Sequence, residues 1–294
     1  MFEGSCVALV TPMKSTGEID ENALNSLVEW HIQEGTDAIV VCGTTGESST
    51  LTPHEHHHVI HLVNKAANKR IPIIAGTGTN ATASTIEQTL AAKEIGVDAC
   101  LIVTPYYNRP TQEGLIAHYH AIAKAVNIPI ILYNVPTRTA CDMQPATVGE
   151  LSKVPTIIGI KEATGNIPRL AELREKCRKD FKFYSGDDPT CLEFITKGGH
   201  GVISITSNAV PKAMHEMCHY ALKKEYDKAQ ALDERLQALH HMMIAQPNPM
   251  PVKWAMHYMG KVESGIRLPL TALTKEHHEN MIQALNKANI EIRG

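Results

Sequence analysis

The sequence lacks the features that mark membrane, secreted and nucleic-acid-binding proteins. No apolar run approaches the length of a membrane-spanning helix, and the segment from Met1 to Thr11 lacks the basic start and long apolar stretch of a secretory leader. The 28 lysines and arginines are outnumbered by 31 acidic residues and form no positive runs, so we expect no basic surface that attracts phosphate backbones. We therefore expect a protein that binds neither membrane nor nucleic acid.

The cysteines also lack a pattern. An odd number without CxxC spacing argues against a disulfide framework, and several cysteines interrupt apolar runs. Reduced, mostly buried thiols are typical of a cytoplasmic protein, and this is the location we expect. The composition, 43% apolar and 20% charged, is that of an ordinary globular chain. The seven cysteines are Cys6, Cys42, Cys100, Cys141, Cys177, Cys191 and Cys218.

Eight short apolar runs with strand-like composition recur along the first two thirds of the chain, and each is followed by a longer stretch with helical spacing. Eight consecutive βα units predict an α/β fold of the (β/α)8 TIM-barrel type, since a doubly wound sheet usually needs about six strands. The runs are Cys6 to Val10, Ala38 to Cys42, Ile71 to Ala75, Ala99 to Val103, Ile128 to Tyr133, Ile157 to Lys161, Phe181 to Ser185 and Gly201 to Thr206.

The strand pattern stops after about residue 224. Helical spacing continues over Lys224 to Met243, Pro251 to Met259 and Glu276 to Ala288, and prolines separate these stretches. We therefore predict a catalytic barrel over residues 1–224 and a C-terminal helical appendage over residues 225–294.

Three motif matches suggest other functions. Gly76 to Ala81 fits a GxGxxA dinucleotide fingerprint, but the barrel removes its Rossmann context. HExxH, a zinc-site pattern, occurs at His54 to His58 and at His215 to His219. In the first, Thr52 and Glu55 also have the spacing of a helix capping box, and the second lies on the expected eighth outer helix, away from the strand ends where barrel chemistry occurs. We interpret both as solvated helix faces and expect no metal.

Lys161 ends the sixth apolar run, which places its amine at the mouth of the barrel with an apolar stem behind it. Desolvation there disfavours the charged ammonium, and the neutral amine is a nucleophile that forms imines with ketones. Tyr133 ends the adjacent fifth run and can bring a phenol close enough to shuttle protons. The alternatives are a structural lysine paired with Glu162 and a tyrosine whose hydroxyl is simply satisfied.

The second run ends in Gly43-Thr44-Thr45-Gly46-Glu47. Its hydroxyls and glycine-freed backbone N–H groups can bind a small carboxylate, although a tight βα turn explains the same residues.

Four motifs in order resemble the dihydrodipicolinate synthase family of Schiff-base aldolases, within the N-acetylneuraminate lyase superfamily. The resemblance covers essentially the whole chain, including Asn248-Pro249 and Pro251-Val252-Lys253 in the tail. The four motifs are Gly43 to Glu47, Tyr106-Tyr107-Asn108, Tyr133 to Pro136 with Arg138-Thr139, and Gly159 to Gly165.

The resemblance implies that the enzyme condenses pyruvate with L-aspartate 4-semialdehyde, without a cofactor, in diaminopimelate and lysine biosynthesis. Lys161 would form the imine, Tyr133 would transfer protons, and Thr44 would link it to a Tyr107 supplied by a neighbouring subunit of a homotetramer built from two tight dimers. Thr45, Gly186 and the backbone at Ile203 would bind pyruvate, and Arg138 would bind the carboxylate of the semialdehyde.

Some family members bind lysine as a feedback inhibitor at the tight-dimer interface, and the resemblance to that site is incomplete. Pro53 replaces a histidine, and Ser84 replaces a glutamate whose charge would face the ligand's ammonium. We expect weak or absent inhibition, unless His54 and Glu87 compensate. The corresponding residues are Ser48, Ser49, His56, Asn80 and Tyr106.

Two other functions stay open. A sister enzyme on the same barrel, N-acetylneuraminate lyase or a 2-keto-3-deoxy sugar-acid aldolase, would share the lysine and tyrosine, but these sisters bind long hydroxylated chains and usually lack an arginine at the position of Arg138. A non-catalytic protein that senses a small amino or keto acid would retain the barrel without turnover.

Overall fold

The structure, a computed structural model, describes residues 2–289 and has eight parallel strands closed into a barrel in sequence order. This confirms the predicted TIM barrel. The strands are β1 (Gly4–Ala8), β2 (Ala38–Val41), β3 (Ile73–Gly76), β4 (Ala99–Val103), β5 (Ile130–Asn134), β6 (Ile157–Glu162), β7 (Lys182–Ser185) and β8 (Gly201–Ser204). β1 pairs with both β2 and β8, so the first and last units close the ring.

Several strands begin or end away from the predicted bounds. The predicted third and fifth runs begin at Ile71 and Ile128, whereas β3 and β5 begin after Pro72 and Pro129. A proline has no N–H to donate to a ladder, although each proline carbonyl still accepts a backbone hydrogen bond from the preceding strand, 2.9 Å long. The first run was also misplaced, since β1 ends at Ala8 and not at Val10.

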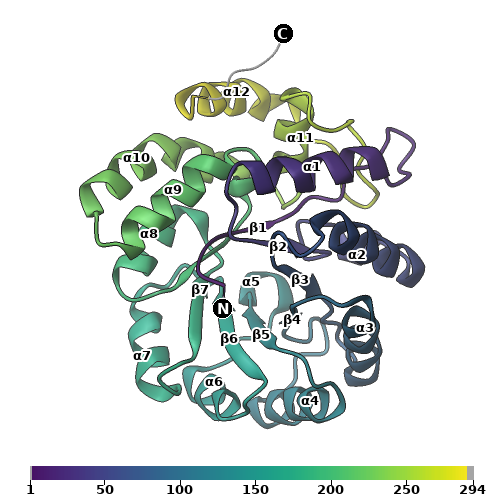
Figure 1. The fold of residues 1–294 in the computed structure, drawn as a ribbon, viewed down its shortest axis with the longest axis vertical. Helices are drawn as coiled ribbons and strands as arrows, with labels where there is room; N and C mark the ends of the chain where they lie inside the picture. Colours follow the sequence, from purple (N-terminus) through teal and green to yellow (C-terminus); the bar gives the residue numbers. More distant parts are fainter. Residues whose placement is uncertain (1, 290–294) are drawn as a thin grey trace.

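The helices that follow the strands mostly surround the barrel in a ring, although the short one after β5 lies over the middle of the barrel in this view (Figure 1). They are α1 (Glu21–Gln33), α2 (Pro53–Ala67), α3 (Thr82–Ile95), α4 (Gln112–Ala125), α5 (Pro136–Thr139), α6 (Pro145–Ser152), α7 (Pro168–Lys176), α8 (Cys191–Thr196) and α9 (Pro211–Leu222). Short 3-10 turns occur at Ser48–Thr50, Asp188–Thr190, Thr206–Asn208 and Lys275–His277. Among residues 2–289, no helix combines the length and apolar character needed to cross a membrane.

Three further helices form the tail: α10 (Tyr226–Met243), α11 (Met250–Tyr258) and α12 (His278–Lys287). Their order and approximate bounds match the three predicted helical stretches. α10 packs against α9 and α12, and Figure 1 places α11 and α12 on the side of the molecule that carries α1. The predicted division at residues 224 and 225 falls in the turn between α9 and α10.

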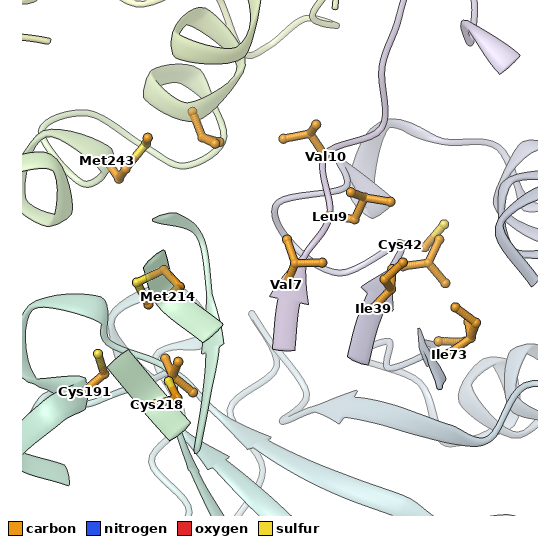
Figure 2. Packing of buried hydrophobic residues seen from close by; sticks show 14 of the residues in the cluster. Val7, Leu9, Val10, Ile39, Cys42, Ile73, Cys191, Met214, Cys218 and Met243 are labelled. Atoms are coloured by element: carbon orange, nitrogen blue, oxygen red, sulfur yellow. The ribbon is translucent and has the colours of Figure 1, made fainter. Parts of the chain in front are cut away.

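Two apolar clusters follow from the alternation of side chains along each strand. The larger lies between the sheet and the helices; Figure 2 shows Val7 and Leu9 near β1, with Met214 of α9 and Met243 of α10 across from them. The smaller fills the barrel interior and includes Ile131, Tyr133 and Ile203. The interior cluster therefore ends, at the carboxyl end of β5, in a tyrosine that the sequence marks as catalytic.

Candidate active site

Lys161 and Tyr133 lie directly opposite each other on β6 and β5. Both are buried, at 6% and 7% exposure, and the Lys161 Nζ lies 4.4 Å from the centroid of the Tyr133 ring. The register of β5 and β6 shifts so that Ile131 pairs with Gly159 while Ile130 pairs with Ile157. The unpaired residue, Ile158, forms a β-bulge, a feature often found beside active sites.

The bulge decides which way Lys161 faces. Ile158 belongs to the interior cluster, so strict alternation would put Ile160 inside as well and turn Lys161 outward. Instead Ile160 packs in the outer cluster and Lys161 contacts Tyr133. Gly159 permits this arrangement, because a Cβ there would lie 2.6 Å from the Lys182 carbonyl oxygen on β7.

Glu162, next to Lys161, is buried and contacts Arg169 on α7, with 3.1 Å between the Arg169 Nε and a carboxylate oxygen. Asn134 Nδ2 and the Thr164 N–H donate further hydrogen bonds to it, at 3.2 and 2.9 Å. Burial raises the pKa of Glu162, and the Arg169 charge opposes this shift. Among the described residues Glu162 therefore pairs with Arg169, and the expected alternative of a Lys161–Glu162 pair is wrong.

Gly186 packs closely against the stem of Lys161. A Cβ at this position would lie 2.9 Å from the Lys161 Cε and 2.6 Å from the Ala163 Cβ, so any larger residue would push against the lysine stem. Ile203 lies on β8, almost fully buried in the barrel interior.

The loop of residues 43–47 follows β2 and is held by the C-terminal tail. Thr45 is buried, and its Oγ1 accepts a hydrogen bond from Asn248 Nδ2 at 2.9 Å. Glu47 forms a buried ion pair with Lys253 of α11 and also accepts the Arg267 N–H at 3.2 Å. Burial lowers the pKa of Lys253, although the Glu47 charge opposes this shift.

A cavity of about 380 Å³ opens at this end of the barrel and is lined by Thr44, Tyr133 and Arg138, among others. Arg138 lies on α5 and donates from its NH2 group to the Asn248 carbonyl at 3.4 Å. Tyr107 is 88% exposed and does not line the cavity. The fold of one chain thus brings together three of the four predicted catalytic residues, Lys161, Tyr133 and Thr44, and leaves Tyr107 outside.

Four of the residues predicted for a lysine site, Ser48, Ser49, His56 and Tyr106, line this same cavity, while Asn80 does not. His56 Nε2 donates to the Gly76 carbonyl at 2.8 Å, and burial lowers the pKa of the imidazole. Pro53 also lines the cavity, whereas Ser84 lies exposed outside it. Within one chain these four residues therefore share a cavity with Thr44 and Tyr133, whereas Lys161 is not among the residues that line it.

The two HExxH matches have different outcomes. In the first, Thr52 and Glu55 form the predicted capping box at the start of α2, and Arg267 hydrogen-bonded to Glu55 lowers the pKa of that carboxyl to about 2. In the second, the side chains of His215 and His219 are 27% and 40% exposed, as a partly solvated helix face would be, but both rings also have a partner. His215 and His219 of α9 both contact the carboxylate of Asp37, a residue far away in the sequence.

Sequence reasoning gave no functional part to Asn248, Lys253, Arg267 or Arg169. Asn248 and Lys253 lie in the tail motifs that contribute to the family resemblance. That resemblance was the only sequence pattern that could have indicated a role for them. A lysine in an otherwise apolar helix such as α11 suggests a buried partner, but nothing local identifies that partner as Glu47.

The family is shown by comparison with known proteins. The Dihydrodipicolinate synthetase family model matches residues 1–288, and the chain belongs to this family. A relative from Methylococcus capsulatus named 4-hydroxy-tetrahydrodipicolinate synthase is 57% identical over 99% of this chain and 100% of its own length. The chain thus has the family's barrel and tail from end to end.

Solved structures of this family superpose closely on the chain. Chloride-inhibited dihydrodipicolinate synthase from Acinetobacter baumannii, in complex with pyruvate, superposes with a TM-score of 0.97 at 50% identity and covers 99% of this chain and 100% of that chain. A structure described as the first monomeric dihydrodipicolinate synthase variant superposes with a TM-score of 0.96 at 35% identity, over 98% of this chain and 97% of that chain.

Proposed function

We propose that this chain is a lyase that condenses pyruvate with L-aspartate 4-semialdehyde to give 4-hydroxy-tetrahydrodipicolinate, a step of diaminopimelate and lysine biosynthesis. The observation that carries the proposal is the buried Lys161 amine on the face of Tyr133, at the carboxyl ends of adjacent barrel strands. The Methylococcus capsulatus relative, 57% identical along the whole chain, bears the name of this activity.

The first half of the reaction makes an enamine from pyruvate. The Lys161 amine attacks the keto carbon, water leaves, and the resulting protonated imine loses a proton from the methyl group to give the enamine. Tyr133, next to the amine, is the group that moves protons during these steps. Thr45 and the backbone at Gly186 and Ile203 would bind pyruvate, with Thr45 on its carboxylate, and Thr44 would extend the proton path from Tyr133.

The second half joins the two substrates. The enamine carbon attacks the aldehyde of the semialdehyde, while Arg138 holds the carboxylate of that substrate by charge-assisted hydrogen bonds. The amino group of the semialdehyde then displaces Lys161 from the imine, which closes the ring and frees the enzyme. The lysine imine supplies the electron sink in this sequence, so we propose that no metal or cofactor takes part.

The sister reaction is the alternative that an assay must separate from this one. N-acetylneuraminate lyase or a sugar-acid aldolase would use the same imine. Among the described residues, the cavity lining includes one arginine, Arg138, and no lysine, and this arginine suits the carboxylate of a short semialdehyde. Turnover of pyruvate with aspartate semialdehyde should exceed retro-aldol cleavage of N-acetylneuraminate by the same preparation. The reverse order would assign the sister function, and no turnover with either would favour a non-catalytic binding protein.

We further propose a cytoplasmic homotetramer in which each site borrows Tyr107 from a second copy of the chain. The exposure of Tyr107 in its own chain supports this arrangement. Mixing inactive Tyr107→Phe and Lys161→Ala subunits should restore part of the activity, since a mixed dimer assembles one intact site. Proven subunit exchange without any recovery would contradict the shared site.

Lysine should inhibit this enzyme weakly or not at all. Ser84 cannot give the charged contact that a glutamate provides, which is worth about tenfold to hundredfold in affinity. Ser84→Glu should therefore strengthen inhibition, measured as the lysine concentration that halves the rate. Inhibition of the wild-type enzyme at sub-millimolar lysine would refute the proposal.

A further inference from the structure

Two histidines and an aspartate meet on the face of the barrel opposite the predicted active site. His215 and His219 lie one turn apart on α9, and Asp37 immediately precedes β2. His215 Nδ1 lies 3.1 Å from Asp37 Oδ2, and His219 Nε2 lies 3.1 Å from Asp37 Oδ1. One potential ligand atom from each of the three lies within 4.8 Å of the others.

The carboxylate is fixed from behind. The Ser5 N–H on β1 donates to Asp37 Oδ2 at 2.8 Å, and a Cβ at Gly4 would lie 2.3 Å from the same oxygen, so the aspartate fits closely against the strand. The two imidazole centroids are 4.1 Å apart, and His215 also packs against Gly35. All three side chains are thus already gathered by the fold.

The cluster is also accessible. The side chains of Asp37, His215 and His219 are 17%, 27% and 40% exposed, so an ion can reach them without unfolding the barrel. A cavity of about 510 Å³ lies beside them, lined by Asp37 and His219 together with Phe2, Glu3, Pro72, Leu222 and Lys223.

We propose that Asp37, His215 and His219 form a binding site for a divalent transition metal, with Zn²⁺ as the best fit. Two imidazoles and one carboxylate are preferred zinc ligands, and a tetrahedral ion then keeps one position for water. Ligands about 2.0–2.2 Å from a tetrahedral zinc lie roughly 3.3–3.5 Å from each other. The two 3.1 Å separations run to different oxygens of Asp37, and the three potential ligand atoms lie within 4.8 Å of one another, so side-chain rotations must bring them to this value.

The position of the site defines what the ion would do. Asp37 lies at the amino end of β2, whereas Lys161 lies at the carboxyl end of β6, so the metal takes no part in imine chemistry. It would instead connect α9 to the segment between β1 and β2. Because β1 pairs with β8, this is where the barrel closes, and the ion would act as a structural link across the closure.

Hydrogen bonds from the two imidazoles to Asp37 explain the same contacts without a metal, and a titration separates the two explanations. Untagged, chelator-treated protein is titrated with Zn²⁺ by calorimetry. We expect one equivalent to bind per chain and to raise the unfolding temperature. His219→Gln, His215→Gln and Asp37→Asn should each weaken this binding by at least about tenfold, since even outer-shell partners of a metal contribute that much.

The other HExxH helix provides a matched control. His54 and His58 on α2 have the same spacing, and His58 contacts Glu21 at 2.7 Å, but within residues 2–289 no shared carboxylate joins the two rings. The double variant His54→Gln/His58→Gln should therefore retain the zinc equivalent. Circular dichroism and pyruvate trapping confirm that each variant is folded. Absence of stoichiometric binding in the wild type, or binding that survives the α9 variants, would overturn the proposal.

Discussion

Lys161 and Tyr133 are supported by residues close to them in sequence, whereas the loop of residues 43–47 is supported by the C-terminal tail about 200 residues away. On the lysine side, next to Lys161, Glu162 contacts Asn134 and Arg169. These three residues all belong to the βα units of β5 and β6. On the loop side, Asn248, Lys253 and Arg267 fix Thr45 and Glu47.

This difference indicates what the helical tail contributes. The barrel alone contains the residues proposed for imine formation, and the tail fixes the loop proposed to bind the pyruvate carboxylate. Arg138 connects the two, because it lies just after β5 and donates to the backbone of Asn248. Damage to the tail should therefore affect substrate binding before it affects the chemistry of Lys161.

The largest effect on the loop side is expected from Lys253→Met. It would leave the buried Glu47 carboxylate without its ion-pair partner, which costs about 3–5 kcal/mol of unfolding free energy. Denaturant titration measures this loss. Lys228→Met, which removes an exposed pair with Glu225, should cause no measurable change.

The double variant Lys253→Met/Glu47→Gln sharpens the test. It removes both charges and should recover most of the lost stability, because the penalty comes from the unpaired carboxylate. Equal stability losses in the single and double variants would mean that packing, and not charge, explains the Lys253 effect.

Arg138→Ala should lower kcat/KM for the semialdehyde by about tenfold to hundredfold, the worth of a charge-assisted contact. Imine formation with pyruvate should persist, because the proposed role of Arg138 is to bind the second substrate. Steady-state kinetics with each substrate varied, together with pyruvate trapping, separates the two steps. Equal loss of both would show that Arg138 supports the lysine side as well.

Asn248→Ala should have the smaller and complementary effect. It removes the hydrogen bond to Thr45 but keeps the backbone carbonyl that Arg138 contacts. We expect KM for pyruvate to rise by about twofold to tenfold, the worth of one neutral hydrogen bond, with KM for the semialdehyde nearly unchanged. An unchanged KM for pyruvate would contradict the proposal that the tail holds the pyruvate-binding loop.

The same comparison explains what the sequence predicted. The carboxyl ends of adjacent parallel strands meet at one edge, so the strand order alone brings Tyr133 close to Lys161. The bulge at Gly159 that turns Lys161 inward was not predicted, because residues 157–160 have no polar alternation to reveal it. The spacing of Thr52 and Glu55 predicted the capping box correctly, since a capping box involves residues within one helical turn.

Long-range polar contacts were beyond sequence patterns. Nothing near Glu47 indicates that Lys253 pairs with it, and nothing near His215 indicates that Asp37 accepts a hydrogen bond from it. Such pairs depend on how α11 and α9 dock on the barrel, which is fixed by the packing of many apolar residues.

The central claim is that pyruvate binds covalently to Lys161, and reductive trapping tests it most directly. The enzyme is incubated with pyruvate, the imine is reduced with borohydride, and the modified peptide is mapped by mass spectrometry. In the wild-type enzyme we expect one adduct per chain, on Lys161. The Lys161→Ala variant should form no adduct and should lose nearly all turnover. An adduct on another lysine, or an enzyme that turns over without any trapped adduct, would contradict the account.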